Sequence, residues 1–346
     1  MGVRFWSASL FLIVLISVSI YSTNTKQSSS QQVQTVFEPV EIKNTNHESV
    51  RKEDEDSSAQ RANNPEEQPD IPSYQVDLNF DPESGELKGM SEITVWNLED
   101  VPLDTIKLHA FLNEFQTESP PILKEHYKKA YPNGVKPTIF TITSIKLEGS
   151  DVPYSMNESV LTIKLPSTWE QREKKTITLT WEATIPKSIN LRFGSDGTTY
   201  WFGNSLPLLA VYNDEWKTTP YLPVGDPFYT DTANFNVSLT IPTEYLIVST
   251  GSEIDSQVNG EKKTYLINAS KVRDFAFAVA KDYKTKTTTT ESGKTINFYY
   301  HYANPDTVAR YTKMAADMLT YLEDRIGPYS GEELDIFETH VQPNYR

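Results

Sequence analysis

Short stretches of alternating apolar and polar residues recur from residue 74 to residue 302, and they constrain the fold more than any other feature. Residues 74–80, Tyr-Gln-Val-Asp-Leu-Asn-Phe, place every second side chain on one apolar face, which is typical of a half-buried β-strand. Further strands are predicted at residues 90–96, 105–108, 139–147, 160–165, 176–184, 235–241, 246–249, 263–268, 275–280 and 296–302. About a dozen strands at such spacing predict a mainly β fold, a sandwich or saddle of antiparallel sheets.

Turn signals separate these strands. Residues 81–85, Asp-Pro-Glu-Ser-Gly, predict a turn, and Asn-Gly at 259–260 predicts a tight hairpin. The apolar run 206–211, Leu-Pro-Leu-Leu-Ala-Val, is predicted as a short buried strand. Residues 121–131 are the one short helical possibility in this region.

The pattern changes at Asn304, which can cap a helix that has Pro305 at its first position. Gly327 and Pro328 end the helix predicted at residues 305–326. Its apolar stripe consists of Val308, Tyr311, Ala315, Met318, Leu319, Leu322 and Ile326. Another strand is predicted at residues 333–337. One helix and one strand cannot bury this stripe by themselves, so we expect the helix to pack imperfectly on the β body or the chain to be prone to aggregation.

Aromatic side chains and prolines crowd into residues 199–236. The aromatic residues are Trp201, Phe202, Tyr212, Trp216, Tyr221, Phe228, Tyr229 and Phe235. Apolar surface of this extent on irregular chain must be buried against a folded body. We interpret the segment as the seam between the β domain and the next part of the chain.

The beginning of the chain indicates export. Arg4 precedes an uncharged apolar stretch at residues 5–21, which predicts a signal peptide at residues 1–21 or, alternatively, a membrane anchor. Residues 22–72 are polar and have no hydrophobic period, so a disordered acidic linker is predicted. The net charge of −15 argues against nucleic acid as a partner, and the absence of cysteine excludes disulfides and thiolate sites.

The histidines and serines, which commonly act as metal ligands and nucleophiles, give no predicted metal-binding or catalytic residue. The histidines are His47, His109, His126, His301 and His340. No two of them lie within five residues of each other, so the His-Glu-x-x-His helix of zinc peptidases is missing. Packing within a strand or a surface position is expected for His109 and His301. Residues 203–207, Gly-Asn-Ser-Leu-Pro, end in proline where a serine-nucleophile elbow requires glycine.

Four carboxylates near the aromatic segment leave two readings open. They are Asp214, Glu215, Asp226 and Asp231. A pair of them beside sugar-stacking rings would suit a glycosidase, but aspartates that form turns are the simpler interpretation. Asn157, Asn236 and Asn268 fit the glycosylation pattern. Substrate-binding residues cannot be assigned from these patterns.

Four segments resemble those of a known family in their order along the chain: residues 74–97, 206–229, 272–276 and 305–340. Their order resembles the front half of the alanyl-aminopeptidase-type zinc metallopeptidases, the gluzincin aminopeptidases. The resemblance implies a β-saddle domain at residues 73–290. It also implies that residues 291–346 are the opening helix and strand of a truncated, thermolysin-like α+β catalytic domain.

In that family such a strand is followed by a Gly-x-Met-Glu segment, which binds the substrate, and by a His-Glu-x-x-His helix, which binds zinc. Residues 341–346, Val-Gln-Pro-Asn-Tyr-Arg, do not match the first of these, so none of the family's zinc ligands can be placed on this chain. We therefore expect the chain to be inactive alone. In complete members of the family, zinc is the expected cofactor and peptides are the expected substrates. A separately encoded catalytic half is the expected partner; the alternative is an exported, non-catalytic β module that binds peptides or glycans through the aromatic segment.

Overall fold

The computed structural model describes residues 71–131, 133–188, 192–222 and 228–339. The predicted signal or anchor lies outside this range, as does nearly all of the predicted acidic linker. Within the described residues, no helix has the length and apolar character that crossing a membrane requires.

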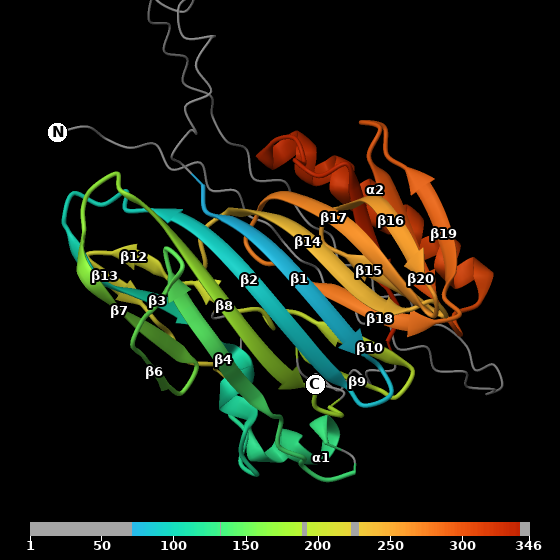
Figure 1. Ribbon diagram of the computed structural model, residues 1–346. Coiled ribbons are helices and arrows are strands. Elements are labelled where there is room, and N and C mark those ends of the chain that lie inside the picture. Colours follow the sequence, from blue (N-terminus) through green and yellow to red (C-terminus); the bar gives the residue numbers. More distant parts are fainter. Residues whose placement is uncertain (1–70, 132, 189–191, 223–227, 340–346) are drawn as a thin grey trace, which may run out of the picture. The chain divides into compact units, whose positions relative to one another are not determined.

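The largest sheet has eight strands, and β1, β2 and β14 run side by side through its middle (Figure 1). In spatial order the strands are β16 (Ser252–Asn259), β17 (Lys262–Val272), β14 (Ala233–Pro242), β1 (Ser73–Asp81), β2 (Glu86–Trp96), β8 (Lys174–Thr184), β4 (Phe140–Leu147) and β5 (Ser150–Asp151). Buried and exposed residues alternate along β1 and β2, as the sequence predicts. One face of this sheet is therefore apolar and needs a covering layer.

Two four-stranded sheets contribute to the same core. One is β15 (Tyr245–Ser249), β18 (Phe277–Lys281), β10 (Thr199–Phe202) and β9 (Phe193–Ser195). The other is β11 (Leu208–Leu209), β3 (Leu103–His109), β7 (Val160–Trp169) and β6 (Tyr154–Asn157). Side chains from all three sheets, such as Phe80, Phe202 and Leu108, meet in one apolar cluster. Each large side chain buried there contributes about 1.5–3 kcal/mol to stability.

The mainly β prediction is confirmed, and every alternating segment overlaps an observed strand. The turn at Asp81–Gly85 and the hairpin at Asn259-Gly260 are also confirmed, and Gly85 and Gly260 both take the positive φ angles that such turns require. Residues 206–211 are not one strand: they form β11 and the start of β12 (Val211–Asn213), which pairs with β13 (Glu215–Lys217).

Among the described residues of the β region, helical structure is limited to three short pieces. A 3-10 helix spans Phe111–Phe115, a second one spans Lys124–His126, and α1 (Tyr127–Ala130) is one turn long. The helical possibility at residues 121–131 therefore corresponds to little more than two consecutive turns.

In the part of the chain that the structure describes, two strand pairs are parallel rather than antiparallel. β1 pairs with β14, and β20 (Thr295–Tyr300) pairs with β21 (Glu333–Phe337). Parallel neighbours need a long connection. The chain between β1 and β14 consists mainly of the intervening strands, and the chain between β20 and β21 contains α2. Alternation along single strands carries no information about such long-range partners.

A second, smaller core lies between one helix and a three-stranded sheet. The sheet consists of β19 (Lys284–Thr289), β20 and β21, and α2 (Pro305–Ile326) packs against β19 and β20. The predicted start of α2 is confirmed, because the Asn304 side chain accepts a hydrogen bond from the Thr307 N–H at 2.8 Å. Val308, Ala315 and Leu319 are buried against the sheet.

The predicted apolar stripe of α2 is wrong in detail. Thr312 belongs to the buried face, and its hydroxyl bonds the Val308 carbonyl at 2.8 Å. By contrast, Met318 is 43% exposed and Ile326 is 54% exposed. The apolar residues of α2 thus form a face wider than the sheet can cover, because the sheet has only three strands.

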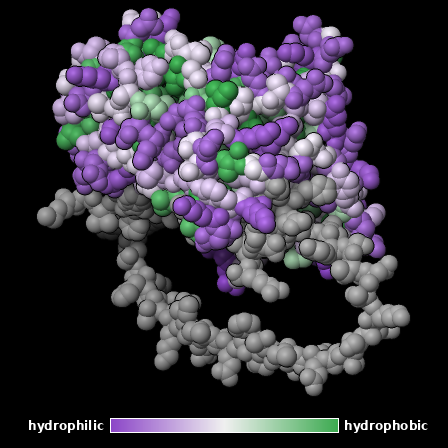
Figure 2. Space-filling model, turned by 90° about the horizontal axis from the view of Figure 1, so that it is seen from below, coloured by the Kyte–Doolittle hydropathy of each residue, from purple (hydrophilic) through white to green (hydrophobic). Residues whose placement is uncertain are grey.

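A third cluster joins the β domain to the smaller core. Trp201 and Tyr283 pack with Val248, Ala278 and Ala280, and Tyr299 and Phe337 of the three-stranded sheet pack against them. Of the aromatic segment 199–236, Trp201 therefore lies at the predicted seam. Tyr221 and Phe235 instead belong to the main core, which buries most of that segment. Figure 2 shows that the face seen from below is mainly hydrophilic, with apolar residues scattered in small groups.

Candidate functional site

An open groove of about 750 Å³ combines aromatic and charged residues from separate parts of the chain. One side comes from β3 and the residues before it, and the other comes from the β12–β13 hairpin. The lining residues are Pro102, Leu103, Asp104, Thr105, Lys107, Thr168, Tyr212, Asp214, Glu215, Trp216 and Thr218. This volume lies within the range of small-ligand and peptide side-chain sites.

The hairpin that forms one side of the groove is held by local contacts. Tyr212 and Trp216 are cross-strand partners, and their rings meet edge to face with centroids 5.4 Å apart. The Tyr212 hydroxyl donates to the Asp214 carbonyl at 3.0 Å. Asp214 takes a φ of 61° at the tip, a left-handed conformation that aspartate tolerates better than most residues. Both rings also pack against the main core, so their positions are fixed.

The charges of the groove are unbalanced. Asp104, Asp214 and Glu215 are exposed carboxylates, and Lys107 is the one cation among the lining residues. Glu215 is partly compensated by Lys217, whose Nζ lies 3.0 Å from its Oε1. The groove therefore favours positive charge.

The structure separates the four carboxylates that the sequence grouped together. Asp214 and Glu215 line the groove, but Asp231 does not, and Asp226 lies outside the described residues. Asp104, which no sequence pattern indicated, joins them from β3. Long-range strand pairing brings it there, and the sequence carries no local signal for that.

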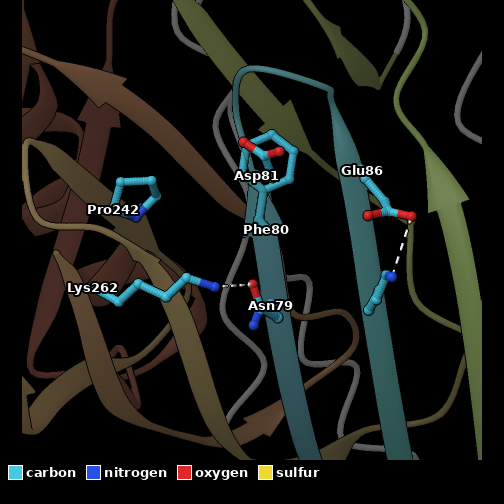
Figure 3. A pocket seen from close by; sticks show the side chains of 7 residues that line it. Asn79, Phe80, Asp81, Glu86, Pro242 and Lys262 are labelled. Carbon is cyan, nitrogen blue, oxygen red and sulfur yellow. Dashed lines mark hydrogen bonds and ion pairs between the residues drawn. The ribbon is translucent and has the colours of Figure 1, made fainter. Parts of the chain in front are cut away.

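A smaller pocket of about 340 Å³ lies near the end of β1 and β2. Figure 3 shows Asn79, Asp81, Glu86, Pro242 and Lys262 around it. Two carboxylates, Asp81 and Glu86, and two lysines, Lys88 and Lys262, balance its charge. The Lys88 Nζ lies 3.4 Å from Glu86 Oε1, and the Lys262 Nζ contacts Asn79 Oδ1 at 3.5 Å. Its polar groups already have partners, so this pocket is a weaker candidate for ligand binding.

Two acidic side chains organise the junction with the smaller core, and the sequence patterns missed both. Glu338 is 7% exposed, and its Oε2 accepts hydrogen bonds from the backbone N–H groups of His301 (2.7 Å), Tyr302 (2.9 Å) and Ala303 (3.4 Å). This single carboxylate fixes the turn that leads from β20 into α2. The one available signal was its place directly after a predicted strand.

Asp335 is the second acidic side chain of the junction. The Asn297 Nδ2 donates to Asp335 Oδ1 at 3.0 Å and to Glu333 Oε2 at 3.3 Å. Burial raises the pKa of Asp335 to about 7, and the neighbouring Glu333 carboxylate adds to the effect. Two carboxylates thus share one amide donor.

The histidines considered as metal ligands in the sequence analysis come together in no group of metal ligands among the described residues, and two of them pack against aromatic rings. His109 is 1% exposed and stacks on Phe111 with ring centroids 4.9 Å apart; burial lowers its pKa to about 4. His301 stacks on Tyr283 at 4.3 Å. His47 and His340 lie outside the described residues, and His126 ends a 3-10 helix.

Ser205 is 2% exposed, which closes its hydroxyl off from a substrate in solvent. The chain beside it is held by Asp274, whose Oδ2 accepts from the Asn204 N–H at 2.6 Å. Of the glycosylation-pattern asparagines, Asn268 and Asn236 are cross-strand partners joined by a 2.7 Å hydrogen bond.

The described residues do not fit a zinc ion. Nowhere in residues 71–131, 133–188, 192–222 and 228–339 do three or more histidine, aspartate or glutamate side chains come together as metal ligands. We therefore assign no step of peptide hydrolysis to these residues.

The chain was compared with known protein families, proteins and structures. Searches of protein-family models and of curated proteins found no match. Solved structures do match: an M1 zinc metallopeptidase from Deinococcus radiodurans has a TM-score of 0.51 and 17% identity. A variant of it with a bound Tyr-Ser-Ala substrate has a TM-score of 0.52 and 17% identity.

In both comparisons the match covers 79% of this chain and 57% of the other. The chain thus spans a little over half the length of these structures. The fold of the described residues is similar to that of the matched part of these M1 zinc metallopeptidases. It comprises an N-terminal β domain followed by one long helix and a small sheet.

Proposed function

We propose that this chain is the β scaffold of a zinc-dependent aminopeptidase, a protein that removes N-terminal residues from peptides. The observation that carries the proposal is the match of 79% of the chain to 57% of an M1 zinc metallopeptidase. The bound Tyr-Ser-Ala peptide of the related structure supports peptides as the substrate class.

The zinc-binding machinery would come from polypeptide outside these 346 residues. No His-Glu-x-x-His sequence occurs among them, and two such histidines with the glutamate between them are what zinc binding and water activation need. In this proposal the chain does not hydrolyse peptides alone. A catalytic half, encoded separately or continuous with this chain, would be its partner.

Helix α2 offers a surface on which that partner could dock. Met314, Met318 and Tyr321 are 51%, 43% and 54% exposed. Their spacing of four and three residues places them on one side of the helix, next to the face that packs on the sheet. Covering three half-exposed side chains would contribute about 2–5 kcal/mol. The remaining portion of a metallopeptidase domain is the occupant we propose.

The test is reconstitution. The 346-residue chain is mixed with a polypeptide that carries the zinc-binding portion of an M1 metallopeptidase, and p-nitroaniline release from alanyl-p-nitroanilide is followed with and without zinc. We expect zinc-dependent hydrolysis by the mixture that exceeds the sum of the two parts. A mixture no faster than its parts would contradict the proposal.

Two variants of α2 make the test specific. Met318→Glu places a charge in the exposed stripe and should abolish the gain in rate. Ala309→Glu adds the same charge at an exposed position about 150° around the helix from the stripe and should leave the gain intact. Equal loss in both variants would show that the stripe is not the docking surface.

We further propose that the chain is exported, with residues 5–21 acting as a cleaved signal or an anchor. Fractionation of the cells that express it, with antibody detection, tests this: protein without these residues outside the cytoplasm, or intact protein in the membrane, is expected. A second candidate function, an exported binding module without catalysis, is favoured by the groove. It would be preferred if reconstitution fails while the groove binds a ligand.

A further inference from the structure

We infer that the groove between β3 and the β12–β13 hairpin binds lysine or arginine side chains of a peptide. Its test measures peptide binding by this chain alone and therefore does not depend on the proposed catalytic partner. The groove would hold a basic segment of a peptide.

Charge complementarity is the first argument. Lys217 pairs with Glu215 at 3.0 Å. This leaves Asp104 and Asp214 against Lys107 and gives the groove an excess of negative charge. The two aspartates come from two separate elements, so that a cation between them meets carboxylates from two sides. Charged groups arranged in this way select oppositely charged ligands and speed their association.

The aromatic pair is the second argument. Trp216 and Tyr212 line the same groove and are half-buried, with part of each ring packed on the main core. An ammonium or guanidinium group over the face of a tryptophan or tyrosine ring is attracted by the ring's negative face. Because both rings are already fixed, a ligand loses little affinity to ordering them.

A basic side chain explains the composition of the groove better than a sugar does. Aromatic rings suit both ligands, but a neutral sugar gains nothing from the excess of negative charge. The aliphatic portion of lysine or arginine can lie along the rings while its charged end reaches Asp104 or Asp214. We therefore expect the groove to bind a positively charged peptide more tightly than a neutral sugar.

The experiment measures binding of fluorescein-labelled, acetylated tetralysine amide to the 346-residue chain by anisotropy at low salt. Tetraglutamine amide and chitotetraose serve as the neutral peptide and the sugar. We expect tetralysine to bind, to bind more weakly at high salt, and to bind more tightly than both neutral probes. Equal or tighter binding of tetraglutamine or chitotetraose, or no binding of tetralysine, overturns the inference.

Variants distinguish the groove from general attraction to an acidic protein. Asp104→Asn combined with Asp214→Asn should weaken tetralysine binding about three- to tenfold. The control, Asp151→Asn with Asp255→Asn, removes two exposed carboxylates that do not line the groove and should have little effect. An equal loss in both double variants would mean that net charge alone attracts the peptide, which overturns the site.

The ring is tested separately. Trp216→Leu keeps an apolar side chain against the core but removes the aromatic face, and it should weaken binding about three- to tenfold. Trp216→Phe should restore most of the affinity. Circular dichroism and urea unfolding verify that each variant is folded. If Trp216→Leu is folded and binds tetralysine as the original chain does, the aromatic part of the inference is refuted.

Discussion

Replacing Asp335 with asparagine should make the chain more stable at alkaline pH and leave it nearly unchanged in acid. The pKa of Asp335 in the folded chain is raised to about 7 from the ordinary value of 3.8. The folded state therefore holds this proton more tightly than the unfolded state does. The resulting stability is complete below pH 4 and is lost as the pH rises through about 7.

The size of the effect can be worked out from the shift. A difference of about three pKa units corresponds to about 4 kcal/mol between strongly acidic and alkaline solution. Between pH 5 and pH 8 the ceiling is about 2–3 kcal/mol, because part of the loss has already occurred at pH 5. Solvent reaches this half-buried group, so we expect about 1–2 kcal/mol. Asparagine can still accept from Asn297 and can donate to Glu333.

Urea unfolding at pH 5 and pH 8 measures this. The original chain should lose about 1–2 kcal/mol more stability over the interval than Asp335→Asn does. Asp324→Asn, which removes an exposed carboxylate on α2, should follow the original chain. If Asp335→Asn and the original chain lose stability equally between the two pH values, the raised pKa at the junction is refuted.

Three further substitutions test the packing and the helix boundary by urea unfolding. Leu319→Ala leaves a cavity where the side chain is 8% exposed and should cost about 2–4 kcal/mol; a loss below half of that would show that α2 is loosely packed. Asn304→Ala removes the bond from the Thr307 N–H and should cost about 1 kcal/mol, whereas Asn304→Asp should not. Gly89→Ala places a Cβ against the Trp181 ring and should cost about 1–3 kcal/mol; unchanged stability would mean that the ring moves freely.

Local patterns in the sequence were enough for the strands that alternate and for the helix. The alternation at residues 74–80 and the Asn304-Pro305 cap predicted β1 and the start of α2 because each rests on neighbours in the chain. Other strands were missed, among them β16 and β19, since neither segment has a buried apolar face. They are strands because β16 pairs with β17 and β19 pairs with β20.

The residues of the groove are likewise of two kinds, those that lie close together in the sequence and those that only the fold brings together. Tyr212, Asp214 and Trp216 lie within five residues of each other, so the sequence grouped these aromatic and acidic side chains, but the hairpin that carries them was not predicted. Asp104 joins them only through the fold. The burial that raises the pKa of Asp335 likewise comes from packing at the junction, and no pattern of neighbouring residues reports it.

We propose that these residues form a scaffold whose metal chemistry comes from elsewhere. Zinc content of the purified 346-residue chain, measured by mass spectrometry after dialysis against micromolar zinc and then against buffer, tests it most directly. We expect far less than one zinc ion to be retained per chain. One tightly held zinc ion per chain would contradict it.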